Sequence, residues 1–249
     1  MGFNLAMNLI VDIGNTQIKF AVFDESLLIE KIAIDPEQAG ESLQNIFQTY
    51  PNLSKGIISS TAEISANLYK TLSENLHLVK FSHQSILNFT NDYKTPETLG
   101  LDRIALVAAA AELFSKQNVL VIDAGSCITY DFIDKNSVYQ GGAISPGLRM
   151  RYRAMHTFTG KLPLLKKTTQ PDHYIGKSTH EAMHIGVYKS ICYEIDAYIE
   201  DYLTDYEDLT VVLTGGDYYL LSASIKNSIF ATSNFLLKGL NKILQLNSN

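Results

Sequence analysis

The chain has 249 residues, of which 46% are hydrophobic and 18% charged, a composition typical of a globular protein and not of a disordered or fibrous one. The formal net charge of -6, without any basic run, argues against nonspecific nucleic-acid binding, which needs clustered Lys and Arg. No stretch approaches the roughly 20 apolar residues that span a bilayer, and the two cysteines form no disulfide framework. We therefore expect a cytoplasmic protein that binds neither membranes nor nucleic acids.

The first predicted element is a buried strand that ends in Asp12-Ile-Gly14-Asn15-Thr16 and returns through an apolar run over residues 18–23. This pattern predicts a β-hairpin. Because Gly14 has no Cβ, backbone N–H groups at the turn can approach an anion closely, and Asp12 stands where a carboxylate can hold a phosphate-bound cation. The alternative is an ordinary turn, in which Asp caps its own backbone and Gly supplies a positive φ.

The next part of the chain alternates helices and strands. Apolar residues at helical spacing predict helices over residues 36–50 and about 62–75, with a short buried strand over residues 56–60 between them. A polar, turn-rich segment over residues 88–100 leads to an Ala-rich helix over residues 102–114. Such alternation is typical of an α/β fold.

The hairpin pattern recurs at Asp123-Ala-Gly125-Ser126, which follows an apolar run and precedes another over residues 128–133. One copy alone could be turn chemistry, but a copy in each half of the chain favours two facing phosphate loops with a nucleotide between them. We predict two lobes, residues 7–114 and residues 115–249, with the option that the last helix packs back on the first lobe.

After the second hairpin, a third strand is predicted to end at Gly141-Gly142. Residues 149–167 are basic and are predicted to be irregular, with Pro163 breaking any long helix.

The remaining elements are a long helix, a strand and a final helix. The helix is predicted over residues 179–202, and Gly186 within it indicates close packing. A strand over residues 208–213 ends in Thr214-Gly215-Gly216, and a helix over about residues 225–246 closes the chain.

Together these motifs resemble those of the type III pantothenate kinases, within the superfamily of acetate and sugar kinases, heat-shock ATPases and actin. Residues 12–19 are similar to its first phosphate motif, residues 123–129 to its second and residues 214–216 to its adenosine motif. Residues 95–103 and 141–147 are similar to stretches that mark the family more narrowly. The resemblance implies an actin-like, ribonuclease H-like α/β fold, with duplicated mixed-sheet lobes around a nucleotide cleft. It also implies transfer of the ATP γ-phosphate to pantothenate, which gives 4'-phosphopantothenate in the first step of coenzyme A biosynthesis.

The resemblance implies that Asp102 is the general base that accepts the substrate hydroxyl proton; a helix N-cap is its structural alternative. Arg103 is expected to bind pantothenate or to offset phosphoryl charge, with a surface ion pair as the alternative. The alternatives for Tyr93 and Thr179 are a half-buried core aromatic and a helix N-cap near Glu181. The expected pantothenate contacts are Tyr93, Gly100, Leu101, Asp102, Arg103 and Thr179.

The resemblance also implies ATP with Mg²⁺, and a K⁺ or NH₄⁺ ion at Asp123. Asp12 is expected on the magnesium side, and Lys19 would otherwise be a solvated charge. Where the family usually has Thr-Ala after its glycine, this chain has Ser126-Cys127; the serine keeps the hydroxyl, and we expect the cysteine to be a small buried filler. The expected nucleotide contacts are Asp12, Ile13, Gly14, Asn15, Thr16, Gln17, Ile18, Lys19 and Ser126.

Two other functions compete with this one. Another small-molecule kinase could use the same fold, although sugar and acetate kinases are usually longer and lack the stretch over residues 100–103. A nonenzymatic regulatory accessory protein could also keep the fold, but the presence of Asp12, Asp102 and Asp123 disfavours it. The resemblance further implies a homodimer in which Thr179 of one chain reaches the site of the other.

Overall fold

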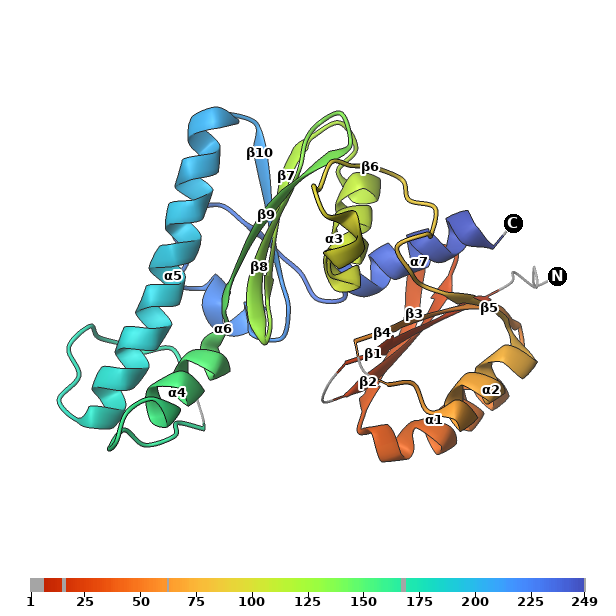
Figure 1. The fold of residues 1–249 in the computed structure, drawn as a ribbon, viewed down its shortest axis with the longest axis horizontal. Coiled ribbons are helices and arrows are strands. Elements are labelled where there is room, and N and C mark those ends of the chain that lie inside the picture. The colour runs from red at the N-terminus through yellow and green to blue at the C-terminus, as the bar shows by residue number, and fades with distance from the viewer. Residues whose placement is uncertain (1–6, 15–16, 62, 167–168, 249) are drawn as a thin grey trace. The chain divides into compact units, whose positions relative to one another are not determined.

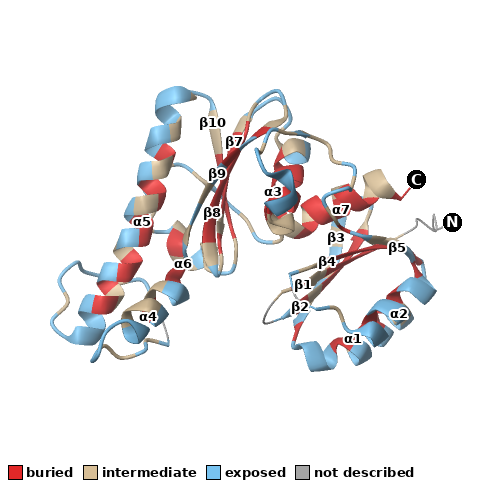
Figure 2. Cartoon of the chain, in the orientation of Figure 1, coloured by how far each residue is buried: buried red, intermediate tan, exposed pale blue. Residues whose placement is uncertain are grey.

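The computed structural model describes residues 7–14, 17–61, 63–166 and 169–248, and the chain divides into two compact units (Figure 1). The first unit contains the chain up to Leu113 together with Phe235 and the residues after it, and the second is Phe114–Asn234. In both, the strands and the inner faces of the helices are buried, whereas the outer faces of the helices are exposed (Figure 2). None of the helices in the described residues is long and apolar enough to cross a membrane.

The first unit is a mixed sheet with strand order β3-β2-β1-β4-β5. Its first three strands form an antiparallel meander, and β4 runs parallel to β1 on the other side. The central strand β1 is almost continuously apolar because helices cover both faces of the sheet. The elements are β1 (Met7–Ile13), β2 (Ile18–Asp24), β3 (Leu27–Ile34), η1 (Pro36–Gln38), α1 (Ala39–Thr49), β4 (Leu53–Ser60), α2 (Ala66–Asn75), β5 (His77–Lys80), β6 (Thr90–Asn91), η2 (Pro96–Thr98), α3 (Leu101–Leu113) and α7 (Phe235–Asn247).

Helices cover both faces of this sheet. Helices α1 and α2 bury one face in a core that includes Leu43 and Leu72. Helix α7 lies on the other face and packs along α3 (Figure 1). The two helices pack closely because Gly239 of α7 lies where a Cβ would overlap the carbonyl oxygen of Ala105. A buried hydrogen bond of 2.9 Å from Asn8 to Asn241 ties β1 to α7.

The second unit repeats the design. Strands β7, β8 and β9 form an antiparallel meander, and β10 runs parallel to β7 on the other side, with β11 beyond it. Helices α4, α5 and α6 pack on one face of this sheet. The predicted α/β fold with duplicated mixed sheets is thereby confirmed. The elements are β7 (Asn118–Ala124), β8 (Cys127–Ile133), β9 (Val138–Pro146), α4 (Leu148–Thr157), α5 (Thr179–Asp205), β10 (Leu209–Thr214), α6 (Tyr218–Ser222) and β11 (Phe230–Ala231).

Two predictions about the middle of the chain were wrong. Strand β9 continues past Gly142 to Pro146, because the missing Cβ at Gly142 lets the strand pass the carbonyl oxygen of Tyr130. The basic stretch is also not irregular throughout, because α4 spans Leu148–Thr157 and Pro163 lies beyond its end.

Two predictions about the later helices also failed. Gly186 is exposed, and a Cβ placed on it would meet nothing within 4 Å, so it does not mark close packing. The last helix begins at Phe235, because the residues before it form β11 and a turn in which Asn234 has a φ of 66°.

Candidate active site

The first unit places a charged pair at the turn between β1 and β2. Asp12 and Lys19 are cross-strand partners, and the Lys19 Nζ lies 3.1 Å from the Asp12 Oδ2. The Gly14 N–H donates to the Gln17 carbonyl oxygen at 3.0 Å and narrows the turn. Lys19 is therefore paired rather than a simple solvated charge, while Asn15 and Thr16 lie outside the described residues.

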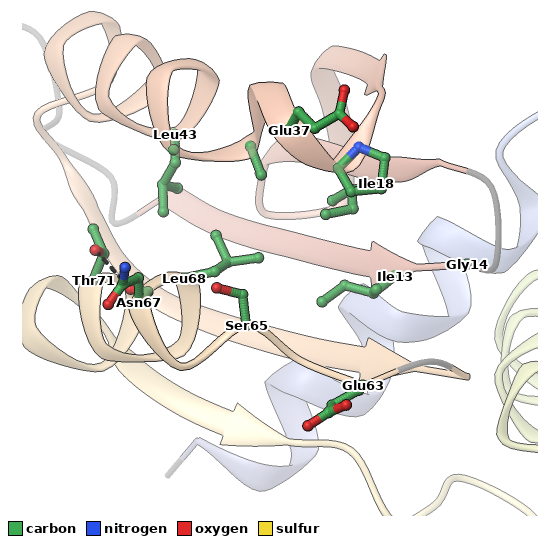
Figure 3. A pocket seen from close by; sticks show the side chains of 13 residues that line it. Ile13, Gly14, Ile18, Glu37, Leu43, Glu63, Ser65, Asn67, Leu68 and Thr71 are labelled. Atoms are coloured by element: carbon green, nitrogen blue, oxygen red, sulfur yellow. Dashed lines mark hydrogen bonds between the residues drawn. The ribbon is translucent and has the colours of Figure 1, made fainter.

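A pocket of about 360 Å³ lies beside this turn, between the sheet and helices α1 and α2 (Figure 3). Three of the predicted nucleotide contacts, Ile13, Gly14 and Ile18, line it. Glu37 and Glu63 stand at opposite sides of its rim, and its wall is otherwise mainly apolar.

The start of α3 holds the predicted general base. The helix begins at Leu101, so Asp102 lies within its first turn and is not the N-cap. The Asp102 Oδ1 accepts a hydrogen bond of 2.8 Å from the Arg103 N–H, which orients the carboxylate. A Cβ at Gly100 would overlap this same oxygen, so glycine at position 100 makes room for the carboxylate.

Arg103 is almost fully buried, with 4% exposure, which rules out the surface ion pair considered for it. Its guanidinium carbon lies 5.6 Å from the centroid of the Tyr93 ring, in cation–π geometry. The Tyr93 N–H in turn donates to the Asn91 side-chain oxygen at 3.0 Å. The half-buried Tyr93 thus packs on the arginine and limits its orientation.

In the second unit, Asp123 stands at the end of β7 between two threonines. Thr129 is its register partner on β8, and Thr214 is its register partner on β10. The turn that follows is closed by a hydrogen bond of 2.9 Å from the Gly125 N–H to the Cys127 carbonyl oxygen. Cys127 is half-buried, so the expectation of a buried filler was wrong.

Two other glycines pack closely against the end of β7 and the turn that follows it. A Cβ at Gly147 would overlap the carbonyl oxygens of Gly125 and Ser126, and the Gly147 N–H donates to the latter at 3.1 Å. Gly215 has a φ of 98°, and a Cβ there would overlap the Asp123 Oδ1 and the Ala124 carbonyl oxygen. Three stretches distant in the sequence therefore converge at one end of this sheet, at Asp123 and the turn that follows it.

Asp217 follows this cluster. Its N–H donates to the Ala124 carbonyl oxygen at 2.9 Å and fixes the 214–216 turn against β7. Burial raises the pKa of the Asp217 carboxyl, and the positive charge of Arg149 partly offsets this rise. Sequence patterns did not identify this residue, because its contact with β7 exists only in the folded unit.

Thr179 opens helix α5 and has an exposed side chain. The capping role considered for it belongs to Ser178, whose hydroxyl accepts from the Glu181 N–H at 3.2 Å. The Glu181 carboxylate accepts in return from the Lys177 N–H at 2.7 Å. Because Ser178 and Glu181 complete the cap, Thr179 is not needed for it.

Comparison with known proteins decides the family. A family model for type III pantothenate kinases matches residues 8–201. The type III pantothenate kinase of Flavobacterium johnsoniae is 45% identical over 239 residues, covering 96% of this chain and 98% of the relative. That of Christiangramia forsetii is 46% identical over 241 residues, covering 97% and 99%. The chain belongs to the type III pantothenate kinase family.

Solved structures support the fold independently. A Campylobacter jejuni protein described as a Baf family transcriptional activator aligns with a TM-score of 0.60 at 24% identity, covering 97% of this chain and 99% of that one. A ROK family glucokinase from Streptomyces griseus aligns with a TM-score of 0.53 at 10% identity, covering 97% and 99%. At these identities the likeness shows the fold alone, and the predicted actin-like kinase fold is confirmed.

Family membership confirms the predicted activity. The enzyme is a pantothenate kinase, which uses ATP and a divalent metal ion. The competing functions, another small-molecule kinase and a nonenzymatic accessory protein, are not supported by these relatives.

Proposed function

We propose that this kinase moves the γ-phosphoryl group of ATP to the primary hydroxyl of pantothenate, with Asp102 as the general base. The observation that carries the proposal is the Asp102 carboxylate, oriented by the Arg103 N–H and given space by Gly100. As the hydroxyl oxygen bonds to phosphorus, its proton passes to the carboxylate and ADP leaves with the electron pair of the broken P–O bond. The product is 4'-phosphopantothenate.

Arg103 is proposed to hold anionic oxygens, either of the pantothenate carboxylate or of the transferring phosphoryl group. Burial and the Tyr93 ring restrict its guanidinium, so little orientational freedom is lost on binding. Tyr93, Gly100, Leu101 and Thr179 complete the proposed pantothenate contacts.

The proposed phosphate contacts are the turn between β1 and β2 in the first unit and Ser126 in the second. The Lys19 ammonium suits phosphate oxygens, and the Asp12 carboxylate beside it suits the magnesium side. When bound, Mg²⁺ neutralises charge on the transferring phosphate. Residues 13–18 would contribute mainly backbone groups, with Asn15 and Thr16 included in the proposal from the sequence.

Asp123 is proposed to hold a monovalent cation, K⁺ or NH₄⁺. The residues around it supply oxygen atoms that suit such an ion, because the Asp123 carboxylate and the Ala124 carbonyl oxygen both lie against the backbone of Gly215 at the end of β7. Carboxylate and carbonyl oxygens are ligands that hard cations prefer.

A homodimer is the proposed assembly, with Thr179 of one chain serving the site of the other. Its support is the segment before α5, where Tyr174 and Ile175 are 78% and 61% exposed. Large exposed apolar side chains gathered beside a proposed substrate residue are typical of an interface. We also propose a cytoplasmic location, in keeping with two free cysteines.

The test is an ADP-release assay with ATP, Mg²⁺ and pantothenate, in which K⁺, NH₄⁺ or Na⁺ is the only inorganic monovalent cation. We expect turnover that requires pantothenate and is supported by K⁺ or NH₄⁺ but not by Na⁺. ADP release that ignores pantothenate would contradict the proposed reaction. Equal rates in all three cations would contradict the role of Asp123 and leave the reaction standing.

A further inference from the structure

The two phosphate turns differ in one cross-strand partner. In the first turn the register partner of Asp12 is Lys19, whose ammonium lies 3.1 Å from the carboxylate. In the second turn the register partner of Asp123 is Thr129. At matching places in a duplicated design, a carboxylate therefore faces an ammonium once and a hydroxyl once.

The Thr129 hydroxyl is an unusual group in its own right. Thr129 is 8% exposed, and its Oγ1 has no hydrogen-bond partner among the described residues. Leaving a buried hydroxyl without a hydrogen-bond partner is unfavourable, so such a group in a native structure calls for an explanation. A cation bound at Asp123 would satisfy it, because a hydroxyl oxygen can donate a lone pair to a cation.

The position of Thr129 points to where that ligand sits. Directly opposite residues of an antiparallel pair share one face of the sheet, with their Cβ atoms about 4.5–5.5 Å apart. Thr214, 4% exposed, flanks Asp123 from the other side in register. Oxygen-bearing side chains thus form a row across β10, β7 and β8, on the face opposite the core packed by α5.

We propose that the Thr129 Oγ1 is a ligand of the monovalent cation at Asp123, and that this cation takes the place that the Lys19 ammonium takes at Asp12. The inference rests on the cation site in the proposed function and adds a ligand and a reason for the ion. An NH₄⁺ ion donates a hydrogen bond to the hydroxyl, whereas K⁺ accepts its lone pair; both carry the single charge of a lysine ammonium.

The test measures ion binding through protein stability rather than through turnover. The melting temperature of the intact protein with ADP and Mg²⁺ is followed while KCl, NH₄Cl or NaCl replaces tetramethylammonium chloride at constant ionic strength. An ion that binds only the folded state raises the melting temperature with its concentration. Thr129→Val keeps the shape of the side chain and removes the hydroxyl, whereas Thr129→Ser keeps the hydroxyl.

We expect the K⁺ concentration for half-maximal stabilisation to rise at least about tenfold in Thr129→Val, as loss of a hydrogen bond or contact to a charged group predicts. Thr129→Ser should stay close to the wild type. Thr210→Val is the matched control, because Thr210 lies on the same face at the other end of β10 and bonds to Gln117. It should leave the K⁺ response unchanged.

The outcomes separate the two proposals. If Thr129→Val responds to K⁺ as the wild type does, the role of Thr129 is overturned and the cation at Asp123 stands. If the wild type gains no stability from K⁺ or NH₄⁺ beyond that from Na⁺, both the cation site and its ligand are overturned. Pantothenate-dependent ADP release, measured on the same samples, reports separately on the kinase reaction.

Discussion

The two turns that end β1 and β7 have the same Asp-x-Gly pattern and the same place in a duplicated sheet, yet their charges are balanced differently. The turn in the first unit contains its own cation, Lys19, in contact with Asp12. The turn in the second unit pairs Asp123 with threonines and crowds it with the backbone of Gly215. Duplication preserves the backbone frame, while the cross-strand partner of the aspartate differs, being an ammonium in the first turn and a hydroxyl in the second.

The substitution with the largest expected effect lies outside both turns. It tests whether the chemical step depends on a residue of α3, so that the turns serve nucleotide and ion binding alone. Asp102→Asn removes the proposed proton acceptor on α3 and keeps the shape of the side chain. We expect kcat to fall by about 10²–10⁴-fold, the contribution typical of general base catalysis. ATP binding, measured by calorimetry, should change little.

Near-normal turnover in a folded Asp102→Asn protein would contradict the assignment of Asp102 as the general base. Asp102→Glu is the companion variant, because it keeps a carboxylate and should retain more activity than the amide.

Lys19→Met is the next largest effect and probes the turn with the built-in cation. Losing a charged contact to phosphate costs about 1.5–3 kcal/mol, so the KM for ATP should rise about 10- to 100-fold. Added K⁺ should not restore it, because the missing charge belongs to the first turn. If K⁺ restored the KM for ATP, the proposed difference between a turn with its own ammonium and a turn that binds an ion would be contradicted.

Gly14, in the first turn, and Gly215, which packs against the second, give a smaller contrast. Gly215→Ala must hold a positive φ of 98° and place a Cβ against the Asp123 Oδ1. We expect a loss of at least about 1 kcal/mol in the free energy of unfolding from the backbone alone, and weaker K⁺ binding. Gly14→Ala would place its Cβ 3.3 Å from the Gln17 carbonyl oxygen, which a small shift relieves. Chemical denaturation of both variants in K⁺ and in Na⁺ checks this; equal losses would contradict it.

The smallest effect provides a baseline away from both turns. Gly186 lies exposed in α5, and a methyl group added there would meet nothing within 4 Å. Gly186→Ala should therefore raise the free energy of unfolding by about 0.5–1 kcal/mol, because alanine is the better helix former. The K⁺ response should be that of the wild type, and a destabilised variant would mean that the face is covered in the assembled protein.

Local sequence patterns predicted the two hairpins, the Ala-rich helix α3 and the duplicated α/β design, because those depend on hydrophobic period and turn chemistry. The patterns failed where distant contacts decide. Strand β9 continues beyond Gly142 because a residue without a Cβ fits beside the Tyr130 carbonyl oxygen of the neighbouring strand. The basic helix α4 is stabilised by Arg151, whose guanidinium lies 2.5 Å from the Glu194 carboxylate.

In the candidate site, too, sequence patterns predicted the local motifs but not the contacts between distant residues. Asp123 and Gly215 stand in motifs that can be read from the sequence, but their mutual contact depends on the pairing of β7 with β10. Thr129 lies inside the second phosphate motif. Only its burial and its unpaired hydroxyl single it out, and neither property can be derived from residue order.

The most direct test of the account is the K⁺ dependence of pantothenate-dependent ADP release in Thr129→Lys, compared with the wild type. A lysine at this position would face Asp123 as Lys19 faces Asp12, where the cross-strand ammonium reaches the carboxylate at 3.1 Å. The account predicts that the variant turns over with Na⁺ as the only inorganic monovalent cation, whereas the wild type needs K⁺ or NH₄⁺. A folded variant that still requires K⁺ as the wild type does would contradict it.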